Sequence, residues 1–140
     1  MIQFEIHEVN KRYLSIKMVD LLSVFENLND IKWAVLWIYG LYGNQHTLDK
    51  EKSINKNKTP LFVSTKQLIE LENNYGQLIE ILIVGDEDSE NLRTYDNDID
   101  MKNNCSVIIE LIDGSFWSVM TDEKYITDSF HDFPGYIRVK

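Results

Sequence analysis

The dipeptide Asp113-Gly114 restricts the fold of this chain more than any other feature, because apolar runs flank it on both sides. Residues 106–112 read Ser-Val-Ile-Ile-Glu-Leu-Ile, and residues 116–120 read Phe-Trp-Ser-Val-Met. Glycine adopts positive φ angles at little cost, so Asp-Gly between two such runs predicts a tight hairpin turn. We therefore expect the two runs to pair as neighbouring antiparallel strands.

A third strand-like run, residues 78–84, is separated from this hairpin by an acidic segment, residues 85–100. The acidic segment has seven carboxylates and one arginine, a net charge of −6. A hydrophobic sheet that carries so concentrated a charge indicates a binding partner rather than a reaction. The seven carboxylates belong to Asp86, Glu87, Asp88, Glu90, Asp96, Asp98 and Asp100.

The first half of the chain predicts two strands, one helix and a long loop. Alternating apolar residues predict a strand over 2–6, and spacing of three and four predicts a helix over 20–28 with Asp20 as its N-cap. Residues 31–39 are rich in aliphatic and aromatic side chains, which predicts a central strand buried on both faces, with Trp33 and Trp37 in the core. Polar residues 41–60 predict a solvated loop.

The second half adds two helices and an edge strand to the three central strands. Ser64 and Gln67 form a capping-box pattern that starts a helix, which Gly76 ends. A last helix is predicted from Thr121 or Asp122 to Phe133, followed by an edge strand over 136–139. The predicted order is β-α-β-α-β-β-β-α-β. It favours one α+β domain over residues 1–140, with about three helices and a mixed or mainly antiparallel sheet.

Composition limits the classes of partner. With 140 residues, 44% hydrophobic, the chain is long enough for one buried core and is not disordered. Its net charge of −9 argues against binding nucleic-acid phosphates or an anionic membrane surface, and a basic protein is the electrostatic complement. No signal-peptide pattern opens the chain, and residues 33–39, its longest apolar run, fall short of the roughly 18 residues that span a bilayer. We expect a cytoplasmic protein.

No motif predicts an enzyme, a metal site or a cofactor. Asp96, Asp98 and Asp100 match the first acidic positions of an EF-hand loop, but Met101 and Val107 stand where that loop requires Gly and Glu. The single cysteine cannot form an internal disulfide and is expected to be a small buried residue. The three histidines are far apart in sequence, and no nucleophile elbow or phosphate-binding glycine loop is present.

Residues 108–119, Ile-Ile-Glu-Leu-Ile-Asp-Gly-Ser-Phe-Trp-Ser-Val, together with the segment that ends in Phe130 and Phe133, carry a resemblance. A small acidic α+β chain with this hairpin resembles the immunity proteins of bacterial polymorphic toxin and contact-dependent growth inhibition systems. The resemblance covers about the last 40 residues of the chain. It implies a protein that binds a basic toxin domain, often a nuclease, and covers its cleft with carboxylates.

On that interpretation, the contacting residues are the seven carboxylates of the acidic segment, with Tyr95 as an aromatic anchor. The alternative hypothesis is a small-molecule-binding or regulatory domain in which Trp33, Trp37 and Trp117 line a pocket. A third is an enzyme whose histidines and carboxylates meet only in the folded chain.

Overall fold

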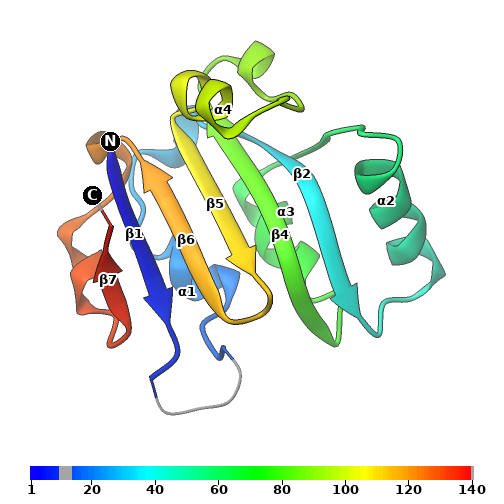
Figure 1. Ribbon diagram of the computed structural model, residues 1–140, viewed down its shortest axis with the longest axis horizontal. Coiled ribbons are helices and arrows are strands. Elements are labelled where there is room, and N and C mark those ends of the chain that lie inside the picture. The colour runs from blue at the N-terminus through cyan, green and yellow to red at the C-terminus, as the bar shows by residue number, and fades with distance from the viewer. Residues whose placement is uncertain (10–13, 140) are drawn as a thin grey trace.

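The computed structural model describes residues 1–9 and 14–139, which form an α+β domain around a seven-stranded antiparallel sheet (Figure 1). The strand order is β3-β2-β4-β5-β6-β1-β7. The strands are β1 (Ile2–His7), β2 (Lys32–Leu41), β3 (Leu61–Val63), β4 (Gln77–Asp86), β5 (Val107–Ile112), β6 (Phe116–Thr121) and β7 (Tyr136–Arg138). The helices are α1 (Met18–Leu22), α2 (Gln45–Asn55), α3 (Thr65–Glu72) and α4 (Asp98–Asn104), with short 3-10 turns at Leu28–Asp30, Ser89–Asn91, Glu123–Tyr125 and Asp128–Asp132.

The predicted hairpin is confirmed. Asp113 and Gly114 have φ angles of 50° and 62°, and positive φ at both central residues defines the type I′ turn that matches the twist of paired strands. Ile112 of β5 lies opposite Phe116 of β6. The turn is also tied to β4, because the backbone N–H of Gly114 donates to the carbonyl of Ile79 at 2.7 Å.

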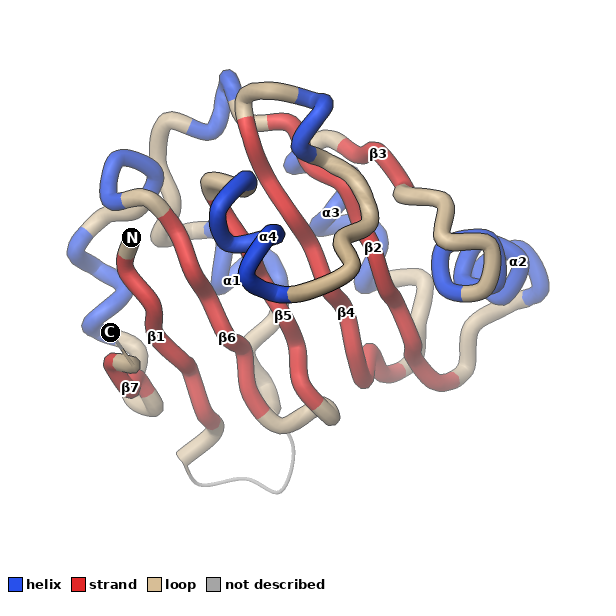
Figure 2. The backbone as a smooth tube through the Cα atoms, turned by 45° about the horizontal axis from the view of Figure 1, so that its top comes forward, coloured by secondary structure: helices blue, strands red, loops and turns tan. Residues whose placement is uncertain are grey.

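The two faces of the sheet are covered very differently. On the inner face, α1, α3 and the 3-10 turns at Leu28–Asp30, Glu123–Tyr125 and Asp128–Asp132 enclose the main core, which includes Phe4, Trp33 and Trp117 (Figure 1). On the opposite side, which we call the outer face, the acidic segment and α4 lie over one end only (Figure 2). The rest of the outer face has no layer packed on it in the part of the chain that the structure describes.

The free edge of β2 is closed by polar side chains from α2. The three-residue β3 pairs with only Trp33 to Val35 of β2. Beyond it, the Asn55 side chain accepts from the backbone N–H of Ile38 at 3.0 Å and donates to its carbonyl at 2.6 Å. The Glu51 carboxylate accepts from the N–H of Gly40 at 3.3 Å, and burial raises the pKa of Glu51 despite that bond. Side chains thus replace a neighbouring strand at an edge that would otherwise invite another chain.

The prediction of a loop over 41–60 is therefore wrong. Asn44 caps α2 by accepting from the N–H of Thr47 at 2.9 Å, and only Thr47 and Ile54 of this helix are buried. With so few buried residues there is no apolar stripe from which a helix could be inferred. The helix is held mainly by its cap and by its bonds to the edge of β2.

The C-terminal helix prediction is also wrong, since residues 121–133 form two 3-10 turns and extended backbone. The backbone of this stretch pairs with the segment after α1. Phe25 and Ile126 form an isolated antiparallel bridge, and the N–H of Thr127 donates to the carbonyl of Val24 at 2.8 Å. These long-range bonds occupy backbone N–H and C=O groups that would otherwise form the hydrogen bonds of a helix.

The remaining differences between prediction and structure concern where one helix ends and on which face of the sheet Trp37 lies. The capping box of Ser64 and Gln67 is confirmed, and so is the edge strand after Gly135. The helix predicted over 20–28 is only α1, which ends at Leu22. Residues 31–39 form the predicted strand, but a bulge between Val35 and Trp37 turns Trp37 outward, and it is 43% exposed rather than in the core.

Asn55→Ala tests the closed edge of β2. Removing the amide leaves the N–H and carbonyl of Ile38 without these partners, so we expect the free energy of unfolding to fall by about 2 kcal/mol. We also expect concentration-dependent self-association, because the bare edge can pair with a second copy. Urea unfolding and size-exclusion chromatography over a concentration series measure both effects. Asn57→Ala, at an exposed position two residues on, is the control. Equal behaviour of the two variants would contradict this role.

Candidate functional site

The acidic segment is attached to the outer face by a second, smaller core. Leu92, Met101 and Cys105 are 2%, 7% and 3% exposed, and they pack with side chains from the sheet. Those sheet side chains are Ala34, Leu36, Val84 and Ile108. The apolar residues scattered among the carboxylates were the available sequence signal for this attachment. The segment is therefore a folded layer rather than a free loop.

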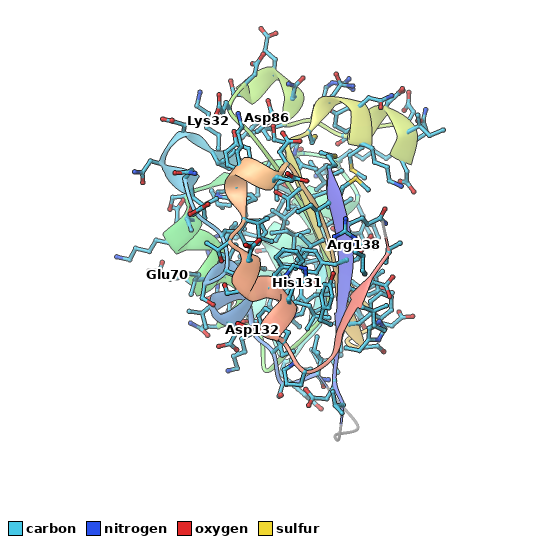
Figure 3. All side chains as sticks on the ribbon, turned by 90° about the vertical axis from the view of Figure 1, so that its left-hand side faces the viewer. Lys32, Glu70, Asp86, His131, Asp132 and Arg138 are labelled. Atoms are coloured by element: carbon cyan, nitrogen blue, oxygen red, sulfur yellow. The ribbon has the colours of Figure 1, made fainter. Side chains whose placement is uncertain are left out.

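Asp86 fixes both ends of the acidic segment. It ends β4, and it is only 7% exposed where the segment leaves the sheet (Figure 3). Its Oδ1 accepts from the N–H and hydroxyl of Ser106, at 3.0 and 2.6 Å, just before β5. Its Oδ2 accepts from the N–H of Asp88 at 3.0 Å and from the Asn91 amide at 2.9 Å. The carboxylate of Asp86 is thus used within the chain, and its contact with a partner stays a prediction.

Hydrogen bonding keeps Asp86 ionised although it is buried. Burial by itself would raise the pKa of this carboxyl, because charge is costly away from water. The bonds from Ser106, from Asn91 and from the backbone N–H of Asp88 outweigh burial and lower the pKa below 3.8. The charge of Asp86 is therefore part of the folded structure.

Glu87 is also engaged within the chain. Its Oε1 accepts from the Tyr125 hydroxyl at 2.6 Å and lies 3.5 Å from the Lys124 ammonium. The Tyr125 hydrogen bond first, and then the charge of Lys124, lower the pKa of Glu87. The side chain remains exposed, so it is on the surface but already has a cation beside it.

Tyr95 holds the segment down rather than projecting toward a partner. It is half-buried in the second core, and its hydroxyl donates to the carbonyl of Asn91 at 2.6 Å. The Arg93 guanidinium lies 4.0 Å from the centre of its ring. Burial raises the pKa of Tyr95 to about 12. Nearby Cys105 is buried as predicted, and burial raises the pKa of its thiol, so the unreactive protonated form is favoured.

The other five carboxylates of the segment are exposed as predicted: Asp88, Glu90, Asp96, Asp98 and Asp100. Two of them make only local contacts that leave the group on the surface. Asp88 accepts from the N–H of Glu90 at 3.0 Å, and Asp100 accepts from the Asn97 amide at 3.1 Å. We call these five residues the acidic border, because all five belong to the segment that runs from β4 into α4 at one end of the outer face (Figure 2).

The uncovered part of the outer face carries two rows of side chains in register. In the first row, Trp37, Leu82, Glu110, Ser118 and Glu5 lie opposite one another on successive strands. In the second, Tyr39 pairs with Glu80, and Ile112, Phe116 and His7 continue the row. Trp37 and Tyr39 are 43% and 44% exposed. The glutamates within otherwise apolar runs were the sequence signal for an outward face.

Three contacts fix the orientation of side chains in these rows. The Trp37 indole Nε1–H donates to Oε2 of Glu80 at 2.9 Å. At the other end, the His7 ring stacks on Phe116 with centroids 4.4 Å apart, and its Nε2 lies 2.8 Å from Glu5 Oε1. Aromatic rings therefore lie next to carboxylates at both ends of these rows, and their side chains are held in place before any partner binds.

A groove of about 420 Å³ runs between the acidic segment and this face. Its lining includes Thr94 from the acidic segment, Trp37 from β2, Glu80 and Leu82 from β4, and Glu110 from β5. Burial raises the pKa of Glu110, and the charges of Asp98 and Glu80 raise it further. Among residues 1–9 and 14–139, no Lys or Arg lies within ion-pairing distance of Glu80 or Glu110.

The three tryptophans do not form one pocket, so this part of the alternative hypothesis is wrong. Trp33 and Trp117 are 1% and 0% exposed in the inner core, where their indoles donate to the Thr65 hydroxyl and the Ile16 carbonyl. Trp37 lies on the opposite face. Trp117 borders a separate hollow of about 570 Å³ near the end of α3.

The histidines also lie in different settings. His7 is on β1, His46 is in the first turn of α2, and the His131 ring contacts Phe130 with centroids 3.9 Å apart (Figure 3). Within the described ranges, no group of His, Cys, Asp or Glu is arranged to hold a metal ion. No helix in those ranges is long and apolar enough to cross a membrane.

Comparison with known proteins finds no match to a family model, to a curated protein or to a solved structure.

Asp86→Ala tests the attachment of the acidic segment. The variant loses four hydrogen bonds and leaves buried donors unpaired, so we expect the free energy of unfolding to fall by about 3 kcal/mol. We also expect faster amide exchange over residues 88–105. Asp96→Ala, which removes an exposed carboxylate of the same segment, is the control. Equal stability and equal exchange in the two variants would exclude the proposed anchoring role.

The lowered pKa of Asp86 gives this stabilisation a pH dependence. Its contribution is complete above the unfolded pKa of about 3.8 and decreases as the pH falls through the lower folded pKa. The difference in stability between the native chain and Asp86→Asn should therefore shrink below pH 3.8. A difference that stays constant under acid would show that the charge contributes nothing.

Glu110→Gln is expected to have the opposite effect on stability. The pKa of Glu110 is raised above 4.5 in the folded chain, so stability falls as the pH rises through the interval between 4.5 and the folded pKa. Glutamine removes that cost, and we expect a higher midpoint of unfolding at pH 7 and no gain at pH 4. Glu90→Gln in the acidic border is the control. A loss of stability at pH 7 in Glu110→Gln would contradict this account.

Proposed function

We propose that this chain is an immunity protein that binds a cognate basic toxin domain of the nuclease type in the cytoplasm and neutralises it by covering its active cleft. The observation that carries the proposal is the ordered acidic border beside an uncovered sheet face. A cationic protein surface is the complement of such a region, and complementary charge speeds association and selects the partner.

The order of the region supports a role in tight binding. Asp86, Leu92 and Tyr95 hold the acidic segment on the sheet, so the five carboxylates of the border keep their places before a partner arrives. Little conformational entropy is then lost on binding. A nuclease cleft presents Lys and Arg to phosphate groups, and carboxylates at fixed positions can pair with the same cations.

The proposed mechanism requires binding and no chemistry from this chain. Occupation of the cleft excludes nucleic acid by steric overlap, while the border neutralises the cations that would hold phosphate. The exposed rings of Trp37 and Tyr39 add apolar contact area next to the charges. Aromatic residues of this kind often contribute most of the free energy at protein interfaces.

A small-molecule-binding or regulatory domain is the second candidate function. The groove of about 420 Å³ beside Trp37 favours it, because small ligands bind in concave sites with a few placed polar groups. A change in the fluorescence of Trp37 with a metabolite, in a chain that binds no protein, would favour this candidate over immunity.

Co-expression with the C-terminal domain of the protein encoded immediately upstream tests the proposal. The expected result is that the upstream domain stops growth by itself, that this chain restores growth, and that the two purify as a complex. Because screened charges contribute less, the complex should weaken with added salt. A toxic domain that this chain neither binds nor neutralises would overturn the proposal.

Neutralising part of the acidic border should slow association with that domain. In the triple variant Asp88→Asn, Asp96→Asn, Asp98→Asn, we expect the association rate at low salt to fall roughly tenfold or more, because electrostatic steering is lost. Asparagine is preferred to lysine because a cation in the first turn of α4 would oppose its dipole. Stopped-flow mixing measures the rate.

The matched control removes the same charge from other surfaces: Glu70→Gln and Asp132→Asn on the inner side of the sheet, and Asp49→Asn on α2 (Figure 3). We expect it to change the association rate by less than about twofold. Equal slowing by both triple variants would show that net charge, rather than the acidic border, steers the partner.

A further inference from the structure

We propose that the groove on the outer face is a subsite for one arginine side chain of the bound protein, with its guanidinium stacked on the Trp37 ring and paired with the carboxylates of Glu80 and Glu110. This inference rests on the proposed function and names a contact within the same interface. The uncovered face is then the place where a basic segment of the partner protein binds.

The groove has the apolar walls of a side-chain pocket. Leu36 and Leu82 line it from β2 and β4, and Ile112 lines it from β5. Thr94 lines it from the acidic segment. An aliphatic stem can bury its methylenes against such walls while its charged end reaches the carboxylates. The volume of about 420 Å³ leaves room for the backbone that carries the side chain.

Trp37 is held in an orientation that suits stacking. Its Nε1–H donates to Oε2 of Glu80 at 2.9 Å, so the ring and one carboxylate are fixed together in the groove. The ring is 43% exposed although the other two tryptophans are buried. A planar guanidinium can lie on an indole face and still donate in its own plane to a carboxylate, which an ammonium group cannot do.

Glu110 supplies a charge that lacks a cation within the chain. It is half-buried where it lines the groove, and no Lys or Arg of the described residues lies within 4 Å of it. Its neighbours Asp98 and Glu80 repel it. The arginine of the acidic segment does not compensate this charge, because Arg93 lies over the Tyr95 ring. A partner cation would relieve the repulsion and pair with a carboxylate that is already partly desolvated.

Charge decides against a second copy as the occupant. The chain has a net charge of −9, and the carboxylates of Glu80, Glu110 and Asp113 belong to residues that line the groove. Two such faces would repel each other on contact. A cationic segment of another protein removes that repulsion, and a nuclease domain that binds phosphate is rich in such segments.

A peptide titration tests the subsite without the toxin. The probe is acetyl-Gly-Arg-Gly-amide, and two peptides with lysine or the uncharged citrulline in place of arginine are controls. We expect the arginine peptide to shift the Trp37 indole and Glu110 amide resonances in a saturable way. The lysine peptide should bind several-fold more weakly, and the citrulline peptide should cause no saturable shift. No saturable shift with arginine, or equal binding of arginine and lysine, would overturn the assignment.

Variants separate the contributions of ring and charge. Trp37→Ala and Glu110→Gln should each weaken arginine-peptide binding roughly five- to tenfold, while Trp37→Phe should keep most of it because a ring remains. Phe62→Ala, which removes an exposed ring from β3, is the control and should bind normally. Since Glu110→Gln is expected to stabilise the fold, lost binding in that variant cannot be attributed to unfolding. Normal binding by both Trp37→Ala and Glu110→Gln would overturn the proposal.

The same variants distinguish failure of the subsite from failure of the proposed function. If the native chain neutralises the upstream domain and Trp37→Ala, Glu110→Gln does so with equal affinity, immunity stands and the arginine subsite is wrong. If the native chain does not neutralise that domain, the proposed function fails, and the peptide titration still decides the subsite. Dimers of the native chain that Trp37→Ala abolishes would identify a second copy as the occupant and overturn the proposal.

Discussion

Four hydrogen bonds converge on the carboxylate of Asp86, and the position of the acidic segment on the sheet depends on them. They join the end of β4 to Ser106 at the start of β5 and to Asn91 inside the acidic segment. A charged, buried acceptor favours such bonds strongly, because unpaired donors and an unpaired charge would both be costly there. One internal carboxylate thus orders the segment that carries the exposed ones.

The sheet is closed at one edge and open on one face. Asn55 and Glu51 of α2 satisfy the backbone of β2 where β3 ends, which removes an obvious place for strand addition. Within residues 1–9 and 14–139, only the end of the outer face near α4 is covered (Figure 2). A partner therefore meets ordered side chains rather than free backbone, and this arrangement favours recognition by charge and shape.

Stability and binding place opposite demands on the groove. Glu110 is partly buried among other carboxylates, and its raised pKa means that the ionised form costs the folded chain stability. A neutral residue there would suit the isolated fold better. Strain of this kind commonly accompanies binding sites, where a group is arranged for a partner rather than for the free protein.

Local patterns determined the elements whose stability is local. The Asp113-Gly114 turn, the capping box at Ser64 and the alternating strands follow from backbone preference and side-chain period, so they could be predicted, and with them the α+β class. Helix α2 could not be predicted, since its polar side chains bind the edge of a strand. The stretch after Thr121 pairs with residues about a hundred positions away instead of forming a helix.

Some properties of the acidic segment likewise follow from the sequence, and others are decided only by the tertiary structure. Its composition alone identified a charged region, and six of its seven carboxylates are exposed. Only the tertiary structure decided that Asp86 and Tyr95 hold the segment in place and that Trp37 faces outward beside Glu80. The physical reason is that charge and turn propensity belong to single residues and their neighbours. Burial, hydrogen-bond partners and the facing of a strand depend on segments that meet only when the chain folds.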